Sequence, residues 1–324
     1  MNIIITNVGR RGYLADYFKC IPGFNGKVYT SDCDRTASGL YGKNDGFFIL
    51  PKPVDDEERY VKELIRVCEE NKIQAVIPVI DPEIYILSKY RDRFKSRGIT
   101  VVVSDNRVLE ICFDKLKMNK FLEKIGVAFP KTFVSVEEFQ SALEKGDIRF
   151  PVIIKPILGS GSVDTFFVDD MDKIHALFKE GMVIQEKLVG TEYGTDTFNS
   201  FDGTPLRCVI KRKISMRSGE TDKSISVHSE AIQNVLLRVA EKLGHIGNLD
   251  CDIIESDGRE YVIDMNPRFG GGYPATHSIG VNLVELLYRL LNGEKVEPEF
   301  GNYPIDILVM KTISVNTAII HNLG

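Results

Sequence analysis

Short apolar runs alternate with amphipathic segments along the first 110 residues, and this alternation constrains the fold more than any other feature of the chain. The expected strands are Asn2–Thr6, Lys27–Ser31, Phe47–Leu50, Gln74–Val79 and Ile99–Ser104. Between them, apolar residues recur with helical spacing at 13–19, 56–71 and 82–97. Strands that alternate with helices predict an α/β domain with a doubly wound parallel sheet, whose ligands lie at the carboxyl ends of the strands.

Polar loops follow three of these strands and should lie along one rim of the sheet: Gly9–Gly12, Asp32–Asp34 and Asp81–Glu83. Arg10 and Arg11 in the first loop could bind an anion or could be ordinary surface charges. Asp81 and Glu83 could bind a substrate ammonium group, but Asp-Pro-Glu is also a common start of a helix. The sequence leaves both questions open.

The rest of the chain changes character twice. Two short helices, at 106–112 and 114–125, lead into a mixed α+β segment that ends near residue 187. The last third is rich in strands, with hairpin turns at Asp202-Gly203 and Ser256-Asp257-Gly258. Met216–Ser224 is polar and contains glycine, so we expect a mobile loop there. The expected domains are 1–112, 113–187 and 188–324.

Composition excludes several classes of protein. A chain of 324 residues is too long for one simple core, and its net charge of −5 without a long basic run argues against non-specific nucleic-acid binding. The N-terminus lacks a signal-peptide pattern, and no apolar stretch reaches the length of a membrane helix. Six widely spread cysteines without a CxxC pair indicate reduced thiols. We therefore expect a cytoplasmic protein with no membrane or nucleic-acid partner.

An apolar strand near residue 262 delivers Asp264, Asn266 and Arg268 at intervals of two residues, so all three side chains should point to one face. Asp252 precedes Asp264 by twelve residues in the opposite arm of the predicted hairpin and should share that face. Carboxylate and amide oxygens suit Mg²⁺ that is shared with phosphates, and a guanidinium suits phosphate or carboxylate. A solvated edge strand before the glycine-rich turn Gly270–Gly272 is the alternative interpretation.

Two other segments carry groups that suit a nucleotide. Lys155 ends an apolar strand and precedes the loop Pro156–Ser162, where a lysine and backbone N–H groups could surround a phosphate. After the strand Val183–Glu186, free backbone groups could recognise an adenine edge, and Glu192 could accept hydrogen bonds from ribose hydroxyls. Each segment alone is also compatible with an ordinary turn or a domain crossover.

A basic cluster could bind phosphates or a substrate carboxylate together with Glu220: Lys211, Arg212, Lys213 and Arg217. The alternative is a solvated strand edge.

The order of these parts resembles the ATP-grasp superfamily, and most closely its carbamoyl-phosphate-synthetase-like branch. The resemblance rests on Lys115 in Asp-Lys-Leu-Lys, Lys155 in PVIIKP, the glycine loop, QEKLVGTEY and the pair Asp252 and Asp264-Met-Asn-Pro-Arg. It covers about residues 1–295 and includes PVIDPEI and VSDN in the first domain. It implies an N-terminal α/β domain followed by a two-lobed ATP-grasp fold, with a single ATP unit.

The resemblance also implies a role for each matching position. Lys115 and Lys155 would contact ATP phosphates beneath a lid formed by Gly159, Ser160, Gly161 and Ser162. The adenine hinge would be Glu186, Lys187 and Leu188, and the ribose ligand Glu192. Mg²⁺, or Mn²⁺ as an alternative, would be bound by Asp252, Asp264 and Asn266. Two positions depart from the pattern, because Asp replaces the Glu of many relatives at 252 and 264, and serines replace some lid glycines.

The implied reaction is ATP-dependent ligation of a small carboxylic or amino acid to an amine through an acyl phosphate. Arg268, Lys155 and Arg217 are the residues expected to act on the reacting groups. A kinase-like enzyme and a non-catalytic ATP-binding protein remain as alternatives. A full carbamoyl phosphate synthetase reaction fits less well because that enzyme resembles two ATP units in tandem. The expected partners are the two small substrates and, by analogy, a second copy of the chain in a homodimer.

Overall fold

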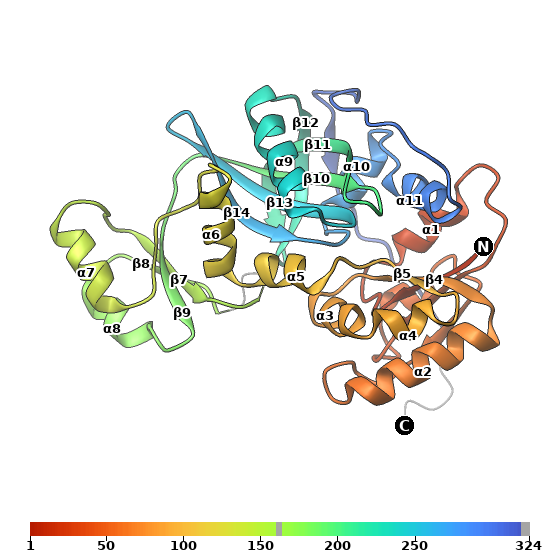
Figure 1. Cartoon of the computed structure of the whole chain (residues 1–324). Helices are drawn as coiled ribbons and strands as arrows, with labels where there is room; N and C mark the ends of the chain where they lie inside the picture. The colour runs from red at the N-terminus through yellow and green to blue at the C-terminus, as the bar shows by residue number, and fades with distance from the viewer. Residues whose placement is uncertain (160–163, 319–324) are drawn as a thin grey trace.

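The computed structural model describes residues 1–159 and 164–318, and its first domain is built on a parallel sheet (Figure 1). The strand order is β3-β2-β1-β4-β5. These strands are β1 (Asn2–Thr6), β2 (Val28–Asp32), β3 (Gly46–Ile49), β4 (Ile73–Pro78) and β5 (Thr100–Val101). All neighbouring strands pair in parallel, which confirms the predicted doubly wound sheet.

Helices connect these strands and cover the sheet. They are α1 (Tyr13–Lys19), the 3₁₀ helix η1 (Ser38–Tyr41), α2 (Glu57–Glu70), α3 (Asp81–Lys89), α4 (Arg91–Lys95) and α5 (Asn106–Phe113). The single helix expected at 82–97 is wrong, because Tyr90 leaves the helical conformation with φ −102° and ψ 9° and separates α3 from α4. The carboxyl end of β1 leads into the Gly9–Gly12 loop, as expected, whereas Asp81–Glu83 after β4 is the first turn of α3 and not a loop.

A small lobe extends to one side of the molecule (Figure 1). Its antiparallel sheet has the order β6-β9-β7-β8. The elements are β6 (Thr132–Phe133), α7 (Val136–Glu144), β7 (Val152–Pro156), β8 (Phe166–Val168), α8 (Met171–Leu177) and β9 (Met182–Glu186). The helix that leads into the lobe, α6 (Lys115–Lys124), packs with the large sheet through Met118 and Leu122. Phe139 of α7 and Ile174 of α8 are fully buried against Val152 and Ile154 of β7, so both helices cover the same face of this sheet.

The large lobe is an antiparallel sheet with the order β14-β13-β10-β11-β12-β15. Its strands are β10 (Thr191–Asn199), β11 (Pro205–Arg217), β12 (Glu220–Val227), β13 (Gly247–Ser256), β14 (Arg259–Asn266) and β15 (Leu308–Met310). Its helices are α9 (Glu230–Leu243), α10 (Tyr273–Ser278) and α11 (Leu283–Leu291). Ile232, Leu236 and Val239 of α9 pack on one face of the sheet and leave the other face to the site. Among the described residues, no helix is long and apolar enough to cross a membrane.

The mobile loop predicted at Met216–Ser224 is wrong. These residues form the end of β11, a tight turn at Ser218-Gly219 and the start of β12. Both turn residues are left-handed, with φ of 50° and 77°, as a two-residue hairpin requires. The inward positions of β12 carry Asp222, Ser224 and Ser226 instead of apolar residues, so hydrophobic alternation could not reveal the strand.

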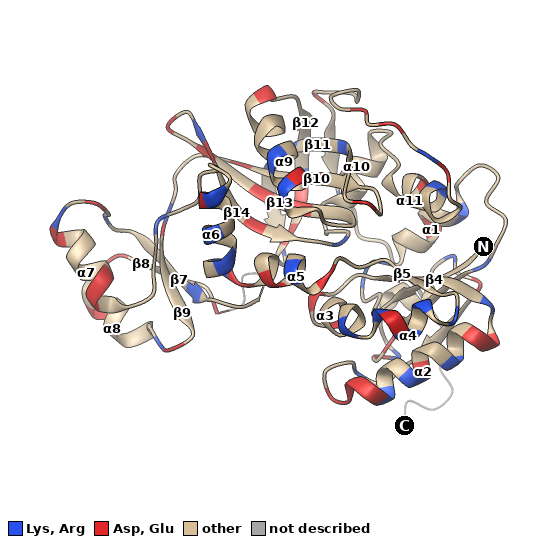
Figure 2. Cartoon of the chain, in the orientation of Figure 1, with Lys and Arg blue, Asp and Glu red and all other residues tan. Residues whose placement is uncertain are grey.

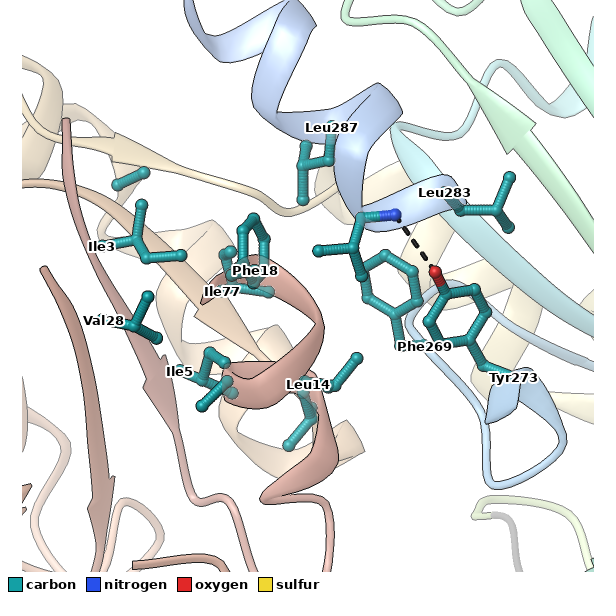
Figure 3. Close-up of a cluster of buried hydrophobic side chains, with 14 of the residues drawn as sticks. Ile3, Ile5, Leu14, Phe18, Val28, Ile77, Phe269, Tyr273, Leu283 and Leu287 are labelled. Atoms are coloured by element: carbon teal, nitrogen blue, oxygen red, sulfur yellow. Dashed lines mark hydrogen bonds between the residues drawn. The ribbon is translucent and has the colours of Figure 1, made fainter. Parts of the chain in front are cut away.

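One hydrophobic cluster joins the first domain to the end of the large lobe (Figure 3). Leu14 and Phe18 of α1 lie in the same cluster as Phe269, Tyr273 and the α11 residues, including Leu283 and Leu287. The hydroxyl of Tyr273 also accepts a hydrogen bond of 3.1 Å from the backbone N–H of Val284. This packing fixes the chain immediately after β14 against the rim of the parallel sheet.

Candidate active site

A cavity of about 720 Å³ lies where the first domain, the small lobe and the large sheet meet. Each part contributes to its lining: Arg10, Arg11 and Asp81 from the first domain, Lys155 from the small lobe, and Asp252 and Asp264 from the large sheet. The cavity therefore collects residues separated by up to about 260 positions in sequence.

The floor of the cavity is formed by the β13–β14 hairpin, where acidic residues mark both strands (Figure 2). Asp252 pairs directly with Asp264 and Asp250 with Asn266, so the predicted neighbours share one face. The amide N–H of Asn266 donates to Asp264 Oδ2 at 3.2 Å. Its carbonyl Oδ1 is buried and has no hydrogen-bond partner among the described residues. An unpartnered oxygen beside two carboxylates fits a cation with oxygen ligands.

Among the described residues, no three His, Cys, Asp or Glu side chains converge to hold a metal ion by themselves. That fits Mg²⁺ better than zinc, because Mg²⁺ commonly takes one or two carboxylates and completes its shell with phosphate oxygens and water.

Lys213 of β11 lies between the carboxylates of Asp252 and Glu192 at the edge of this floor. Its Nζ lies 2.7 Å from Asp252 Oδ1 and 2.7 Å from Glu192 Oε1. Burial alone would lower the pKa of Lys213, but the two carboxylates raise it above its ordinary value. Burial raises the pKa of Asp252, and the Lys213 charge partly opposes this. Asp252 and Glu192, predicted as metal and ribose ligands, thus share one cation in the structure.

Arg268 lines the cavity and pairs with carboxylates of the first domain and of the large sheet. Its Nε lies 2.9 Å from Asp81 Oδ1, and its Nη1 lies 3.1 Å from Asp250 Oδ2. Burial disfavours the charge of Arg268, but the two carboxylates outweigh it and raise its pKa. With only 10% of its side chain exposed, the guanidinium is held as a fixed cation in the lining of the cavity.

Lys115 and Lys155 provide cations at the small-lobe end. Both line the cavity, and Lys115 Nζ donates to the backbone carbonyl of Gly159 at 2.8 Å. Burial lowers the pKa of both lysines, and the neighbouring Lys115 charge helps to lower that of Lys155 to about 8. Two lysines that repel each other in a buried place gain most from an added anion.

The structure describes only part of the predicted lid over the phosphates, and it describes the predicted adenine hinge in full. Gly159 lines the cavity, whereas Ser160, Gly161 and Ser162 lie outside the described residues. Glu186 ends β9 and accepts a hydrogen bond of 3.1 Å from the backbone N–H of Lys131. Lys187 Nζ lies 5.0 Å from the ring centre of Phe167, which itself lines the cavity. Lys187 therefore contacts a residue of the cavity lining, but none of Glu186, Lys187 and Leu188 belongs to that lining.

The predicted basic cluster is not one site. Arg217 is 57% exposed, pairs with Asp222 at 3.3 Å and is absent from the cavity lining, so the structure does not bring it to the reacting groups. Lys211 is buried and bonds Asp196 and the hydroxyl of Thr276. Of the four residues, Lys213 is the one in the cavity lining.

Sequence reasoning missed Asp250 and the partner of Arg268. Asp250 lies two residues before Asp252, so period-two spacing could have placed it on the same face. Asp81 and Arg268 are 187 residues apart, and no local signal connects them. Glu83 does not accompany Asp81, because it is fully buried in the first domain, where it accepts a hydrogen bond from Tyr60. Burial raises the pKa of Glu83 to about 7.

Comparisons with known proteins agree with this architecture. Residues 3–102 match the PylC-like N-terminal domain family, and residues 112–272 match the ATP-grasp domain family. A carbamoyl-phosphate synthase of Methanobrevibacter smithii is 25% identical over an alignment 269 residues long, which covers 77% of this chain and 70% of that protein. A carbamoyl phosphate synthase large chain of Mesorhizobium japonicum is 22% identical over 83% of this chain.

The match with the Mesorhizobium japonicum large chain spans only 26% of the length of that protein. Among solved structures, the biotin carboxylase–beta-gamma-ATP complex from Campylobacter jejuni superposes with a TM-score of 0.74 at 16% identity, and the match covers 95% of this chain and 74% of that one. The order of domains, the two family matches and the shared fold together show that the chain belongs to the ATP-grasp superfamily, in its carbamoyl-phosphate-synthase-like branch.

Proposed function

We propose that this protein is an ATP-dependent ligase that activates a small carboxylic or amino acid as an acyl phosphate and joins it to an amine. The observation that carries the proposal is the convergence of three kinds of group in one cavity. Asp252, Asp264 and Asn266 offer oxygen ligands, Lys115 and Lys155 offer cations, and the fixed guanidinium of Arg268 lies beside them. Two similar proteins are named as carbamoyl-phosphate synthases, and this supports the same class of reaction.

The nucleotide is assigned to the small-lobe end of the cavity. Lys115 and Lys155 hold the phosphates, the segment Glu186–Leu188 borders the adenine, and Glu192 is released from Lys213 to hold the ribose. Asp252, Asp264 and Asn266 hold Mg²⁺, or Mn²⁺ as an alternative. When bound there, the ion neutralises phosphate charge and orients the γ-phosphate.

The chain's own groups account for the two chemical steps. A carboxylate oxygen attacks the γ-phosphorus, an O–P bond forms, the bond to the β–γ bridging oxygen breaks, and ADP leaves. Arg268 and Lys155 stabilise the charge on the transferring group, because they are positioned before the reaction. A neutral amine then attacks the acyl carbon, phosphate leaves, and the nitrogen loses one proton to solvent to give the amide.

The remaining expectations about the setting are part of the same proposal. We place the enzyme in the cytoplasm, acting on two small molecules without a nucleic-acid or membrane partner, and assembling as a homodimer. The net charge of −5 and the absence of an apolar membrane helix among the described residues support the soluble setting.

A screen of acids against amines tests the function. The purified chain is incubated with MgATP, a panel of acids that includes bicarbonate and the amino acids, and a panel of amines; ADP, phosphate and new masses are measured. The ligase predicts equal amounts of ADP, phosphate and amide for one pair. A stable phosphorylated acid without amide would favour the kinase-like alternative. Nucleotide binding without ADP release from any pair would favour the non-catalytic one.

A further inference from the structure

The part of the cavity lined by the first domain and the start of β12 is bordered by three cations that share a single carboxylate. Arg10 Nη2 and Arg11 Nη2 lie 3.7 and 3.6 Å from Glu220 Oε1, and Lys311 Nζ lies 3.4 Å from Glu220 Oε2. The arginines come from the loop after β1, Glu220 from the start of β12, and Lys311 from the residue after β15. Arg10, Arg11 and Glu220 line the cavity itself.

This cluster has an excess of two positive charges and loose geometry. A carboxylate that is the intended partner of arginine usually lies at about 2.7–2.9 Å, often with two parallel hydrogen bonds. The three distances to Glu220 are all longer than this. Arg11 donates through Nη1 to the backbone carbonyl of Val79, and its buried Nε has no hydrogen-bond partner among the described residues. Arg11 is therefore held in place with one buried donor unused, and all three cations share one carboxylate at long distances.

The cluster and Arg268 have different carboxylate partners. Arg268, whose two carboxylate partners are Asp81 and Asp250, lies on the wall beside the metal-ligand face. The nearby Gly271 leaves space for the Glu220 side chain, because a Cβ at this glycine would come 2.4 Å from Glu220 Cδ. The turn after β14 thus lets the Glu220 carboxylate sit against the backbone that leads from Arg268.

We infer that this part of the cavity binds a second anionic group, carboxylate or phosphate, carried by one substrate at a distance from its reacting carboxylate. The anion enters between Arg10, Arg11 and Lys311 and replaces Glu220 as their partner. The inference rests on the proposed function in one respect, since it describes the substrate of that site. It narrows the substrate class to molecules with two anionic groups, such as dicarboxylic acids, acidic amino acids or phosphorylated acids.

The variant Glu220→Gln distinguishes this proposal from a purely structural role of the cluster, because the two predict opposite changes in anion affinity. If Glu220 only ties β12 to the first domain, Glu220→Gln loosens the cavity and weakens the binding of any ligand there. If Glu220 occupies the place of a substrate anion, the same substitution removes an internal competitor, and anions bind more tightly. Gln has nearly the same shape as Glu, so the sign of the effect separates the two roles.

The test is calorimetric titration of the full chain with MgCl₂ and a non-hydrolysable ATP analogue, so that the phosphate end is already filled. The probes are succinate, L-glutamate and glycerol 3-phosphate, with acetate as the single-charge control. We expect at least one dianionic probe to bind, Arg10→Ala to weaken it about fivefold, and Glu220→Gln to tighten it about fivefold. Arg97→Ala, which removes another exposed arginine paired with a glutamate, leaves the affinity unchanged.

The outcomes are decisive in both directions. Failure of all three dianionic probes to bind the wild-type chain would overturn the inference, as would an unchanged or weaker affinity in Glu220→Gln whose thermal midpoint matches the wild type. Arg10 is 66% exposed, so its variant keeps the test valid if the Glu220 variant is unstable. Tighter binding of glycerol 3-phosphate than of succinate identifies phosphate as the natural group. These binding measurements need no turnover, so their result is independent of a failed ligase screen.

Discussion

At the scale of single residues, the site contains two pairs of like charges that lie close together. Lys155 and Lys115 lie close together in a buried place, and Asp252 and Asp264 face each other directly across two strands. Like charges in these positions are unfavourable by themselves. A bound nucleotide and cation would neutralise both pairs, so the groups that most need a partner are the ones expected to bind it.

The pKa of Lys155 leads to a prediction about ATP affinity. Because this pKa is lowered to about 8, the cationic form is complete near neutral pH and is lost as the pH rises through 8. Phosphates bind the protonated form, so the affinity for ATP should fall about tenfold between pH 7 and pH 9. Equilibrium titration with a fluorescent ATP analogue measures this.

In Lys155→Arg the guanidinium stays charged throughout this range, so the fall in ATP affinity should become smaller. A wild-type affinity that does not change up to pH 9.5 would contradict the assignment of Lys155 to the phosphates.

Asp264→Asn tests the metal-ligand face. The variant keeps the shape of the side chain but removes one charged ligand, so we expect kcat/KM to fall at least about a hundredfold, measured by ADP release in the presence of Mg²⁺. The free energy of unfolding without ligands should not decrease, because the repulsion from Asp252 is relieved. Glu260→Gln on the same strand lies outside the cavity lining and serves as the control. Full activity in Asp264→Asn would remove Asp264 from the site.

At the scale of elements, the turn that follows β14 determines where Arg268 points. Gly270 lies against the Asp250 carboxylate, which in turn holds the Arg268 guanidinium. A Cβ at Gly270 would come 2.1 Å from Asp250 Oδ2, whereas a Cβ at Gly272 would have 3.9 Å to its nearest neighbour. The three glycines are therefore not equivalent, and the first one is needed for close packing.

We accordingly expect Gly270→Ala to lower the free energy of unfolding by about 1–3 kcal/mol, because the buried carboxylate must move away from Arg268. Gly272→Ala should stay within about 0.5 kcal/mol of the wild type. Urea denaturation followed by circular dichroism distinguishes them. Equal stability of the two variants would show that Asp250 is not fixed as the structure has it.

The two hairpins of the large sheet differ in how far the sequence predicts them. The β13–β14 hairpin was predictable because Asp257-Gly258 suits a two-residue turn and apolar residues alternate on its arms. The β11–β12 hairpin was not, because small polar residues occupy its inward positions. The pair Asp252 and Asp264 followed from spacing alone, whereas Arg217 was misplaced since the direction of a side chain near a turn depends on the register. The domain boundaries and the residue roles stay predictions.

At the scale of the whole molecule, the first domain and the large lobe share a core. Leu287 of α11 is fully buried in the cluster that contains Ile3 and Ile5 of β1 (Figure 3). Contacts of this kind cannot be read from local patterns, because they join the two ends of the chain. They explain how Asp81 and Arg268 come within 2.9 Å of each other.

A substitution in this shared core should therefore affect both parts. Leu287→Ala is expected to cost about 2–5 kcal/mol, and amide hydrogen exchange should speed up in β1 as well as in α11. Leu308→Ala, at a side chain that is 48% exposed, should change the stability by less than about 0.5 kcal/mol. Faster exchange in α11 alone would indicate that the two parts are stable independently.

The central claim, activation of a carboxylate by ATP, is tested most directly with oxygen isotopes. The acid found in the screen is labelled with ¹⁸O in its carboxylate, and the phosphate released with its amine and MgATP is measured by mass spectrometry. The acyl-phosphate route predicts one ¹⁸O in each phosphate and one in each amide. Phosphate that carries no ¹⁸O while amide is formed would contradict it.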